Sequence, residues 1–229
     1  VRRQRQMCIR DSIGIVLWSG SNMRSHGQCI AEFLYLMGIK PKYQSGSMRV
    51  NGLEVIPLAE LKRPRIDVTA RISGLFRDSM PSVAELLDKA VLLAASLDEK
   101  DEDNYVKKHI TAESAELEES EGMTKEEAWR QAAFRIFGDQ QGVYGAGVAA
   151  LLEAKNWDTI DDIADVYVRW GGHAYGGKTR GKFLPQQFRK RMGSLDVTIK
   201  NEDNHETNML SSDDYNACLL YTSDAADEL

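Results

Sequence analysis

Residues 67–81 read DVTARISGLFRDSMP, a stretch that begins like a buried strand and ends in charged and turn-forming residues. Val68 and Ile72 are the apolar residues expected of a strand in a parallel sheet. Arg77 and Asp78 follow where that strand would end, and ligands of open parallel sheets bind beyond the carboxyl ends of the strands. Two interpretations stay open. Arg77 and Asp78 line a ligand site, or Asp78 caps the following helix while Arg77 pairs with a surface carboxylate.

The apolar patterns before residue 81 predict an α/β fold. IGIVLW (residues 13–18) is a continuous apolar run, typical of a strand buried on both faces. Residues 29–39 carry apolar side chains at helical spacing. Residues 53–58 and 66–74 are further strand candidates. Strand, helix and strand in alternation indicate a parallel-type sheet, so residues 13–80 are predicted to be the α/β part of a domain.

The apolar period becomes helical after residue 81. Ser82 with Glu85, and Thr124 with Glu127, have the spacing of capping boxes at helix starts. Residues 81–217 are therefore predicted to be a mostly helical part of the same domain, with a short strand near residues 196–201.

The two ends of the chain have no periodic pattern that joins them to their neighbours. Both ends can be back-translated as complementary strands of one DNA element, which resembles a transposon-end adapter used in sequencing libraries. Residues 1–12 and 218–229 are accordingly expected to be adapter-derived and not native. Residues 13–217 are then expected to be a fragment of a larger multidomain protein.

Charge and cysteine content narrow the class of protein. The net charge is −6, and leaving out the two ends removes four basic and four acidic residues, so it does not change. A mildly acidic chain disfavours nonspecific nucleic-acid binding. No apolar run approaches the roughly 20 residues of a membrane span. Cys29 is the one cysteine outside the two ends, which excludes an internal disulfide framework and favours a cytoplasmic location.

General catalytic motifs are weak in this sequence. Ser19-Gly20-Ser21 could bind an anion at a helix start, but a plain turn explains it better because the dinucleotide fingerprint and the P-loop lysine are missing. The sequence has no pair of Cys and His residues at zinc spacing and no nucleophile elbow.

Two glycine-dense segments, GVYGAGV (residues 142–148) and WGGHAYGG (residues 170–177), form the second candidate cluster after Arg77 and Asp78. Glycines let the backbone approach either another element or a flat ligand. The neighbouring rings would pack on such a ligand or, in the alternative, belong to the core. These rings are Tyr144, Trp170, His173 and Tyr175.

The third cluster is an ionisable segment that follows the strand expected near residue 200. It contains Glu202, Asp203, His205, Glu206, Asp213 and Asp214. Carboxylates and imidazole suit a divalent cation or proton transfer. The alternative is a solvated acidic loop.

Four segments together resemble a known family. In chain order they are IDVTARISGLFRDSMP, RIFGDQQGVYGAGVAALLEAKNW, YVRWGGHAYG and VTIKNEDNHETNMLSSDDY. They resemble the C-terminal part of the large subunit of aerobic cobaltochelatase, a family similar to the H subunit of magnesium chelatase. The resemblance runs nearly from residue 13 to residue 217, and the arginine-rich strand and the Trp-Gly-Gly segment favour the cobalt enzyme. His173 departs from the pattern, because the cobalt family usually has Tyr there.

The resemblance implies ATP-dependent insertion of Co²⁺, the substrate metal, into the corrin hydrogenobyrinic acid a,c-diamide during cobalamin synthesis. The large subunit would hold the tetrapyrrole, while separate AAA+ partner subunits would bind ATP with Mg²⁺ and hydrolyse it. The missing P-loop agrees with that division. The fragment alone is expected to be inactive.

Metal insertion requires groups that take protons from ring nitrogens and strip water from the cation. Under this hypothesis Arg71 and Arg77 bind acidic ring substituents, because arginine offers bidentate donors to carboxylates. Tyr144, Trp170, His173 and Tyr175 would pack on the ring. The catalytic candidates are Asp78, Glu202, Asp203 and Asp213, and the metal-ligand candidates are His173, Glu202 and Asp203.

Two alternatives remain. One is insertion of Mg²⁺ into protoporphyrin IX by the same fold. The other is a non-catalytic docking region for the ATPase partners, which the strongly charged helix face in HITAESAELEES (residues 109–120) would fit.

Overall fold

The centre of the structure, a computed structural model that describes residues 11–201, is a six-stranded sheet in the order β7-β6-β5-β4-β1-β8. The strands are β1 (Ser12–Leu17), β4 (Asp67–Ile72), β5 (Ile136–Gly138), β6 (His173–Gly176), β7 (Thr179–Phe183) and β8 (Val197–Lys200). β8, β1, β4 and β5 run parallel, and β6 and β7 are added antiparallel. This confirms the predicted α/β class with a mostly parallel sheet.

β1 and β4 are the central strands, and every residue in both is buried. They pair in parallel register from Ser12 opposite Asp67 to Leu17 opposite Ile72. Alternate side chains of β1 reach the two cores, since Ile15 packs in one and Val16 in the other. Burial on both faces explains why this strand reads as a continuous apolar run.

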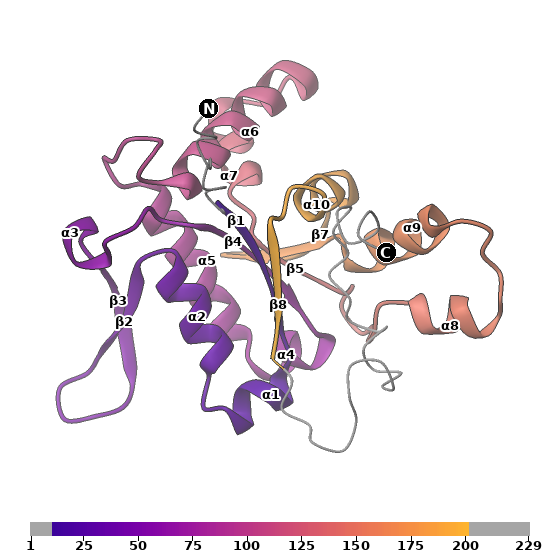
Figure 1. The fold of residues 1–229 in the computed structure, drawn as a ribbon, viewed down its shortest axis with the longest axis horizontal. Coiled ribbons are helices and arrows are strands. Elements are labelled where there is room, and N and C mark those ends of the chain that lie inside the picture. Colours follow the sequence, from indigo (N-terminus) through magenta and orange to yellow (C-terminus); the bar gives the residue numbers. More distant parts are fainter. Residues whose placement is uncertain (1–10, 202–229) are drawn as a thin grey trace, which may run out of the picture.

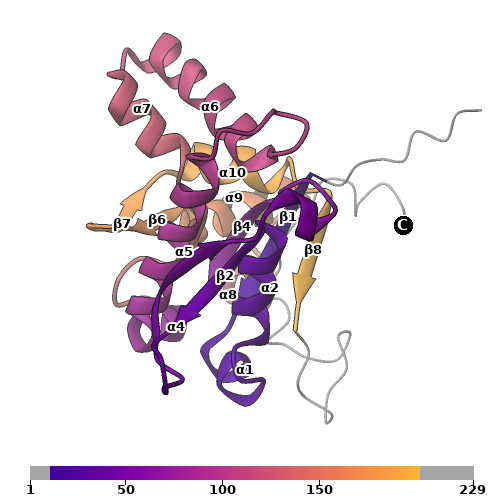
Figure 2. The same ribbon diagram turned by 90° about the vertical axis from the view of Figure 1, so that its left-hand side faces the viewer.

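Helices cover both faces of the sheet (Figures 1 and 2). One face packs against α2 (Gln28–Leu36), α5 (Pro81–Ala95) and α6 (Tyr105–Glu121), with α7 (Lys125–Ala132) beside α6. The other face packs against α8 (Val148–Glu153), α9 (Ile160–Gly171) and α10 (Pro185–Met192). Connections before β5 thus cover one face, and those after β5 cover the other. None of the helices in residues 11–201 has the length and apolar character of a membrane span.

The remaining elements lie outside these layers. Short helices are α1 (Ser19–Arg24), α3 (Leu58–Leu61) and α4 (Gly74–Ser79). β2 (Ile39–Tyr43) and β3 (Val50–Val55) form a separate antiparallel ribbon. The strand expected at residues 53–58 therefore lies in this ribbon and not in the central sheet.

The strand of the opening stretch is shorter than predicted. β4 ends at Ile72 because the Ser73 hydroxyl accepts a hydrogen bond from the Phe76 amide (3.2 Å) and caps α4. Arg77 and Asp78 consequently lie in α4, one helical turn beyond the strand.

The two expected capping boxes have different outcomes. The Thr124–Glu127 box at the start of α7 is confirmed. The Ser82–Glu85 box does not form, because Pro81 already occupies the first turn of α5 and Met80 is the N-cap residue.

Residues 81–201 contribute more strand than their helical pattern indicates. β8 lies at the position predicted for a short strand, whereas β5, β6 and β7 have no counterpart among the predicted elements. They span three to five residues each, too few to show a period of two. Of the ends expected to be adapter-derived, Asp11 and Ser12 are described. The Asp11 amide donates to Asp196, and Ser12 begins β1.

Candidate functional site

The carboxyl ends of the parallel strands bring the predicted segments together at one edge of the sheet, called here the carboxyl edge. Residues 73–78 follow β4, and residues 139–147 follow β5. His173 begins β6 opposite Gly138, the last residue of β5, because these two strands are antiparallel. Asn201 follows β8, which is parallel to β1. All four segments quoted from the sequence therefore reach this edge, where ligands of open α/β sheets bind.

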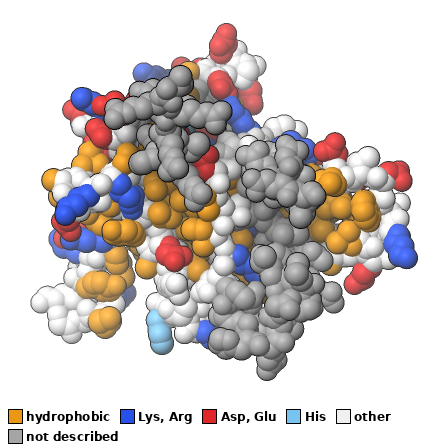
Figure 3. All heavy atoms as spheres, in the orientation of Figure 1, with side chains coloured by type: hydrophobic (Ala, Val, Ile, Leu, Met, Phe, Trp, Pro, Cys, Tyr) orange, Lys and Arg blue, Asp and Glu red, His pale blue; other side chains and the backbone are white. Residues whose placement is uncertain are grey.

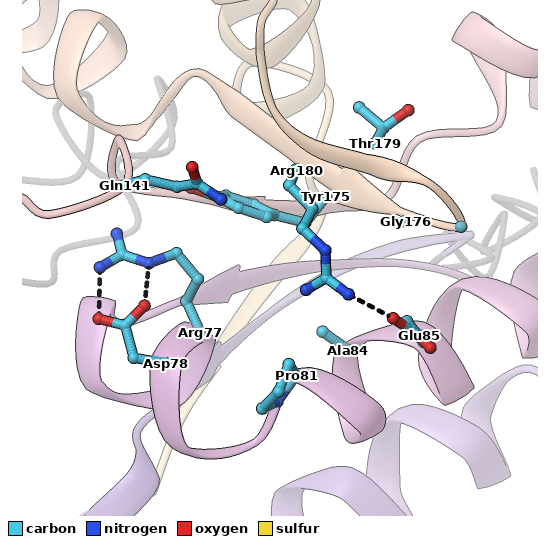
Figure 4. A pocket seen from close by; sticks show the side chains of 11 residues that line it. Arg77, Asp78, Pro81, Ala84, Glu85, Gln141, Tyr175, Gly176, Thr179 and Arg180 are labelled. Carbon is cyan, nitrogen blue, oxygen red and sulfur yellow. Dashed lines mark hydrogen bonds and ion pairs between the residues drawn. The ribbon is translucent and has the colours of Figure 1, made fainter.

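Arg77 is buried at the carboxyl edge, and its guanidinium bonds to both α4 and the loop after β5. Its Nε and Nη2 donate to the two carboxylate oxygens of Asp78, each at 2.7 Å. Its Nη1 donates to the backbone carbonyls of Asp139 (3.1 Å), Gln140 (2.5 Å) and Val143 (3.2 Å). Arg77 thereby fastens the loop after β5 onto α4. Figure 4 shows its pairing with Asp78.

Asp78 is ionised, and both of its carboxylate oxygens accept hydrogen bonds. Its hydrogen bonds from Arg77, reinforced by one from the Tyr144 hydroxyl (2.7 Å), lower the pKa of Asp78 to about 2. A carboxyl with so low a pKa is a poor proton acceptor at neutral pH. The arrangement therefore fits Asp78 as the residue that orients Arg77, and not as the group that takes ring protons.

Asp139 is a central residue of the site that the sequence patterns do not single out. Its carboxylate accepts a hydrogen bond from Arg71 Nη2, and both side chains are 1% exposed. Its backbone carbonyl also accepts from the Tyr175 hydroxyl. Arg71, predicted to bind substrate, is here a buried support of the site. No local signal marks Asp139, because β5 before it is only three residues long.

The four predicted aromatic residues differ in what they offer a ligand. Tyr144 is 60% exposed, while the Arg77 guanidinium lies 5.5 Å from its ring centroid. Tyr175 is buried, and burial raises the pKa of its hydroxyl. His173 is buried against Phe183, with ring centroids 4.9 Å apart, and its Nδ1 lies 3.2 Å from the Trp170 carbonyl. Among these four, Tyr144 presents the most accessible ring.

The glycines of the site accommodate the protein's own aromatic rings. A Cβ at Gly147 would lie 2.5 Å from Trp170 Cε2, and one at Gly74 would lie 2.6 Å from Tyr144 Cδ1. Of the two interpretations of the glycine-dense segments, close approach between elements is therefore what the structure shows at Gly147. Gly74 lies outside both segments, but it makes room for Tyr144 of the first one.

Replacing Gly147 by Ala is expected to lower the free energy of unfolding by about 1–3 kcal/mol more than replacing Gly142 by Ala. Both glycines have positive φ (+72° and +79°), so both substitutions carry the backbone cost. Only Gly147 faces Trp170, whereas nothing lies within 4 Å of a Cβ at Gly142. Urea unfolding of the two variants measures the difference, and equal losses would contradict the packing argument.

A cavity of about 220 Å³ opens beside Arg77, between α4, α5 and the β6–β7 hairpin. At its mouth Arg180 Nη2 donates to Glu85 Oε1 at 2.8 Å (Figure 4). The lining residues are Arg77, Asp78, Pro81, Ala84, Glu85, Gln141, Tyr175, Gly176, Gly177, Thr179 and Arg180.

The structure describes one of the three predicted metal ligands, His173. Within residues 11–201 there is no group of three or more His, Cys, Asp or Glu side chains placed to hold a metal ion. Glu202, Asp203 and Asp213, the predicted proton and metal groups, lie outside the described residues. His173 is described, but its ring packs on Phe183.

The fold is that of a metal-chelatase family, as comparison with known proteins shows. The family model described as CobN/Magnesium Chelatase matches residues 2–223, and the chain belongs to this family. The aerobic cobaltochelatase subunit CobN of Sinorhizobium sp is 44% identical over 95% of this chain and 17% of its own length. An uncharacterized protein of Methanocaldococcus jannaschii is 49% identical over 90% of this chain and 16% of its own length.

A solved structure supports the same assignment. The catalytic subunit of cobaltochelatase from Mycobacterium tuberculosis superimposes with a TM-score of 0.82 at 42% identity, covering 91% of this chain and 17% of that one. The chloroplastic magnesium-chelatase subunit ChlH of Oryza sativa subsp. indica is 33% identical over 90% of this chain and 14% of its own length. The chain thus spans about one sixth of the length of the relatives it matches.

Proposed function

We propose that this chain is part of a cobaltochelatase large subunit that inserts Co²⁺ into hydrogenobyrinic acid a,c-diamide in cobalamin biosynthesis. Separate AAA+ subunits would hydrolyse ATP, with its Mg²⁺, and the complex would act in the cytoplasm. The observation that carries the choice of metal is the identity of 44% with a CobN subunit against 33% with a ChlH subunit.

The geometry of the carboxyl edge supports a role in holding the tetrapyrrole. Tyr144 offers an exposed ring that packs against Gly74, and its hydroxyl donates a hydrogen bond to Asp78. A flat macrocycle would rest on this ring, because offset stacking of aromatic systems is favourable. Arg77 would hold the platform rigid, since its donors are already engaged with Asp78 and the loop after β5.

Residues that follow β8 in the sequence would accept protons from the ring and bind the metal. Glu202, Asp203 and Asp213 are the proposed proton acceptors, with Glu202, Asp203 and His173 as proposed metal ligands. The carboxyl end of β8 lies beside that of β1, and these residues follow β8 in the sequence. A carboxylate of ordinary pKa would take protons from ring nitrogens more readily than Asp78 with its low pKa.

Replacing Tyr144 by Ala in the full-length subunit is expected to weaken binding of hydrogenobyrinic acid a,c-diamide by about 3–10-fold. An aromatic contact contributes about 0.5–1.5 kcal/mol beyond area burial. Absorbance titration of the metal-free corrin measures the dissociation constant. Tyr43→Ala is the matched control, because Tyr43 is also half exposed but lies on the β2–β3 ribbon.

The same titration tests the choice of substrate. The unsubstituted subunit is expected to bind the corrin more tightly than protoporphyrin IX. Tighter binding of protoporphyrin IX would favour the magnesium alternative, and an unchanged corrin affinity in Tyr144→Ala would remove the stacking role.

A docking role for this part of the chain has its own supporting observation. Hydrophobic side chains gather on the surface over the α8–α9 region (Figure 3), where Trp157 and Ile160 are 41% and 50% exposed. Exposed apolar residues that cluster can mark interaction sites. Capture of the ATPase subunit by the 229-residue chain, without tetrapyrrole binding, would favour docking over the chelation role.

A further inference from the structure

The cavity beside Arg77 is too small for a tetrapyrrole ring. Its volume is about 220 Å³, below the roughly 300–1,000 Å³ of pockets that enclose drug-sized ligands. An arm that projects from a ring edge would fit, with the ring itself outside. Tyr144, the proposed platform for the ring, contacts Asp78, which lines this cavity.

The cavity walls suit an arm with an apolar stem and a polar end. Pro81 and Ala84 of α5 form an apolar floor, and the Tyr175 ring lines the opposite side (Figure 4). Gly176 and Gly177 place backbone without side chains on the hairpin side. Methylene groups could therefore pass between α5 and the hairpin.

The two arginines that line the cavity differ in their freedom to bind a ligand. Arg77 is buried and held by both oxygens of Asp78 and by three backbone carbonyls. The Arg180 side chain is 55% exposed and contacts Glu85, which is itself 37% exposed. Exposed ion pairs contribute little net stability, so the Arg180–Glu85 pair can be exchanged at small cost.

A ligand carboxylate is a better partner for Arg180 than Glu85 in one respect. A carboxylate held inside the cavity can accept two parallel N–H bonds from the guanidinium, whereas Arg180 makes one hydrogen bond to Glu85 at the mouth. Glu85, at the exposed mouth, would return to solvent when it is displaced.

We propose that the cavity holds a carboxylate-bearing arm of the tetrapyrrole and that Arg180 binds this carboxylate in exchange for Glu85. The inference rests on the proposed function and adds a specificity residue to it. The Arg180–Glu85 ion pair would then break only when a ring that carries a carboxylate arm binds.

The test compares the two halves of one ion pair in the full-length subunit. Dissociation constants are measured by absorbance for hydrogenobyrinic acid a,c-diamide and for the same ring with its carboxylates capped as methyl esters. The variants are Arg180→Gln and Glu85→Gln. Lys178→Gln is the control, since Lys178 is exposed in the turn of the same hairpin and does not line the cavity.

Arg180→Gln is expected to reduce the preference for the acid over the ester by about tenfold or more, the range of a charge-assisted hydrogen bond. Glu85→Gln is expected to keep or increase affinity for the acid, because it frees Arg180. Lys178→Gln should change neither. A loss in Arg180→Gln without a loss in Glu85→Gln is the signature of exchange, since both substitutions break the same ion pair.

Equal weakening by Arg180→Gln and Glu85→Gln would overturn the inference, because the pair would then only hold the hairpin on α5. An Arg180→Gln variant that keeps the full acid preference would also overturn it, and the proposed function would stand in both cases. Failure of the unsubstituted subunit to bind the corrin would overturn the proposed function and this inference with it.

Discussion

Replacing Asp67 by Asn is expected to lower the free energy of unfolding by about 3–5 kcal/mol, the loss seen when one member of a buried ion pair is removed. Asp67 begins β4 and is completely buried. Its carboxylate accepts from Arg135 Nε (2.7 Å) and Nη2 (3.1 Å) and from Arg191 Nη1 (2.7 Å), with His109 Nδ1 at 2.9 Å. Both guanidiniums are buried and would lose this carboxylate, keeping Glu113, which lies 2.7 Å from Arg191 and 3.7 Å from Arg135.

Urea unfolding of the purified chain at neutral pH measures this effect. Asp101→Asn is the matched control, because Asp101 is exposed in the turn before α6 and its loss should change stability by less than about 0.5 kcal/mol. A loss below about 1 kcal/mol in Asp67→Asn would contradict the expected contribution of this ion-pair network to stability.

The ionisation of Asp67 is expected to make the stability of the fold depend on pH. Burial by itself would raise the pKa of Asp67, but Arg135 and Arg191 outweigh it and hold the pKa well below its usual range. The unfolded chain, with an ordinary Asp pKa of about 3.9, then binds more protons than the folded chain in acid. The contribution of Asp67 is therefore fully present above roughly pH 5 and is lost as the pH falls towards the folded pKa. The Asp67→Asn variant should lack this part of the acid dependence.

Replacing Asp139 by Ala is the second large expected loss, again about 3–5 kcal/mol. Arg71 would remain buried between the sheet and α9 without the Asp139 carboxylate, beside Tyr167, whose ring centroid lies 5.8 Å from the guanidinium. The Asp139 backbone carbonyl, which receives Tyr175 and Arg77, would persist. The loss would therefore report the carboxylate alone.

Asp165→Asn is the matched control for Asp139→Ala. Both carboxylates pair with an arginine, but the side chains of Asp165 and Arg189 are 65% and 49% exposed, whereas those of Asp139 and Arg71 are each 1% exposed. Exposed pairs contribute about 0–1 kcal/mol, so Asp165→Asn should cost little stability. Urea unfolding compares the two variants, and similar losses in both would refute the distinction between buried and exposed pairs.

The elements predicted correctly are those whose residues carry their own signal. β1 is buried on both faces and reads as an unbroken apolar run, and Thr124 with Glu127 forms the capping box that its spacing indicates. The opening stretch shows the limit of such patterns. Ser73 ends β4 and starts α4 in a single residue, so the apolar residues Leu75 and Phe76 belong to a helix turn and not to the strand.

The location of the site was easier to predict from the sequence than the roles of its individual residues. Arg71 lies in β4 and Arg77 follows it in α4. No local sequence signal tells which of the two supports the site and which contacts a ligand. Arg71 is buried because Asp139, 68 residues later, lies in the neighbouring β5 connection. Whether a charged side chain is a support or a ligand contact depends on such distant partners.

The sequence by itself determined the α/β class, the central buried strands and membership of the chelatase family, because each of these is written in local apolar periods or in ordered motifs. Only the tertiary structure decided that four separate segments meet at one edge, that Trp170 fills the space at Gly147, and that Arg180 reaches Glu85 across a cavity. These contacts join residues that are 23 to 95 positions apart. Their energies depend on burial and geometry, which arise when strands and helices pack.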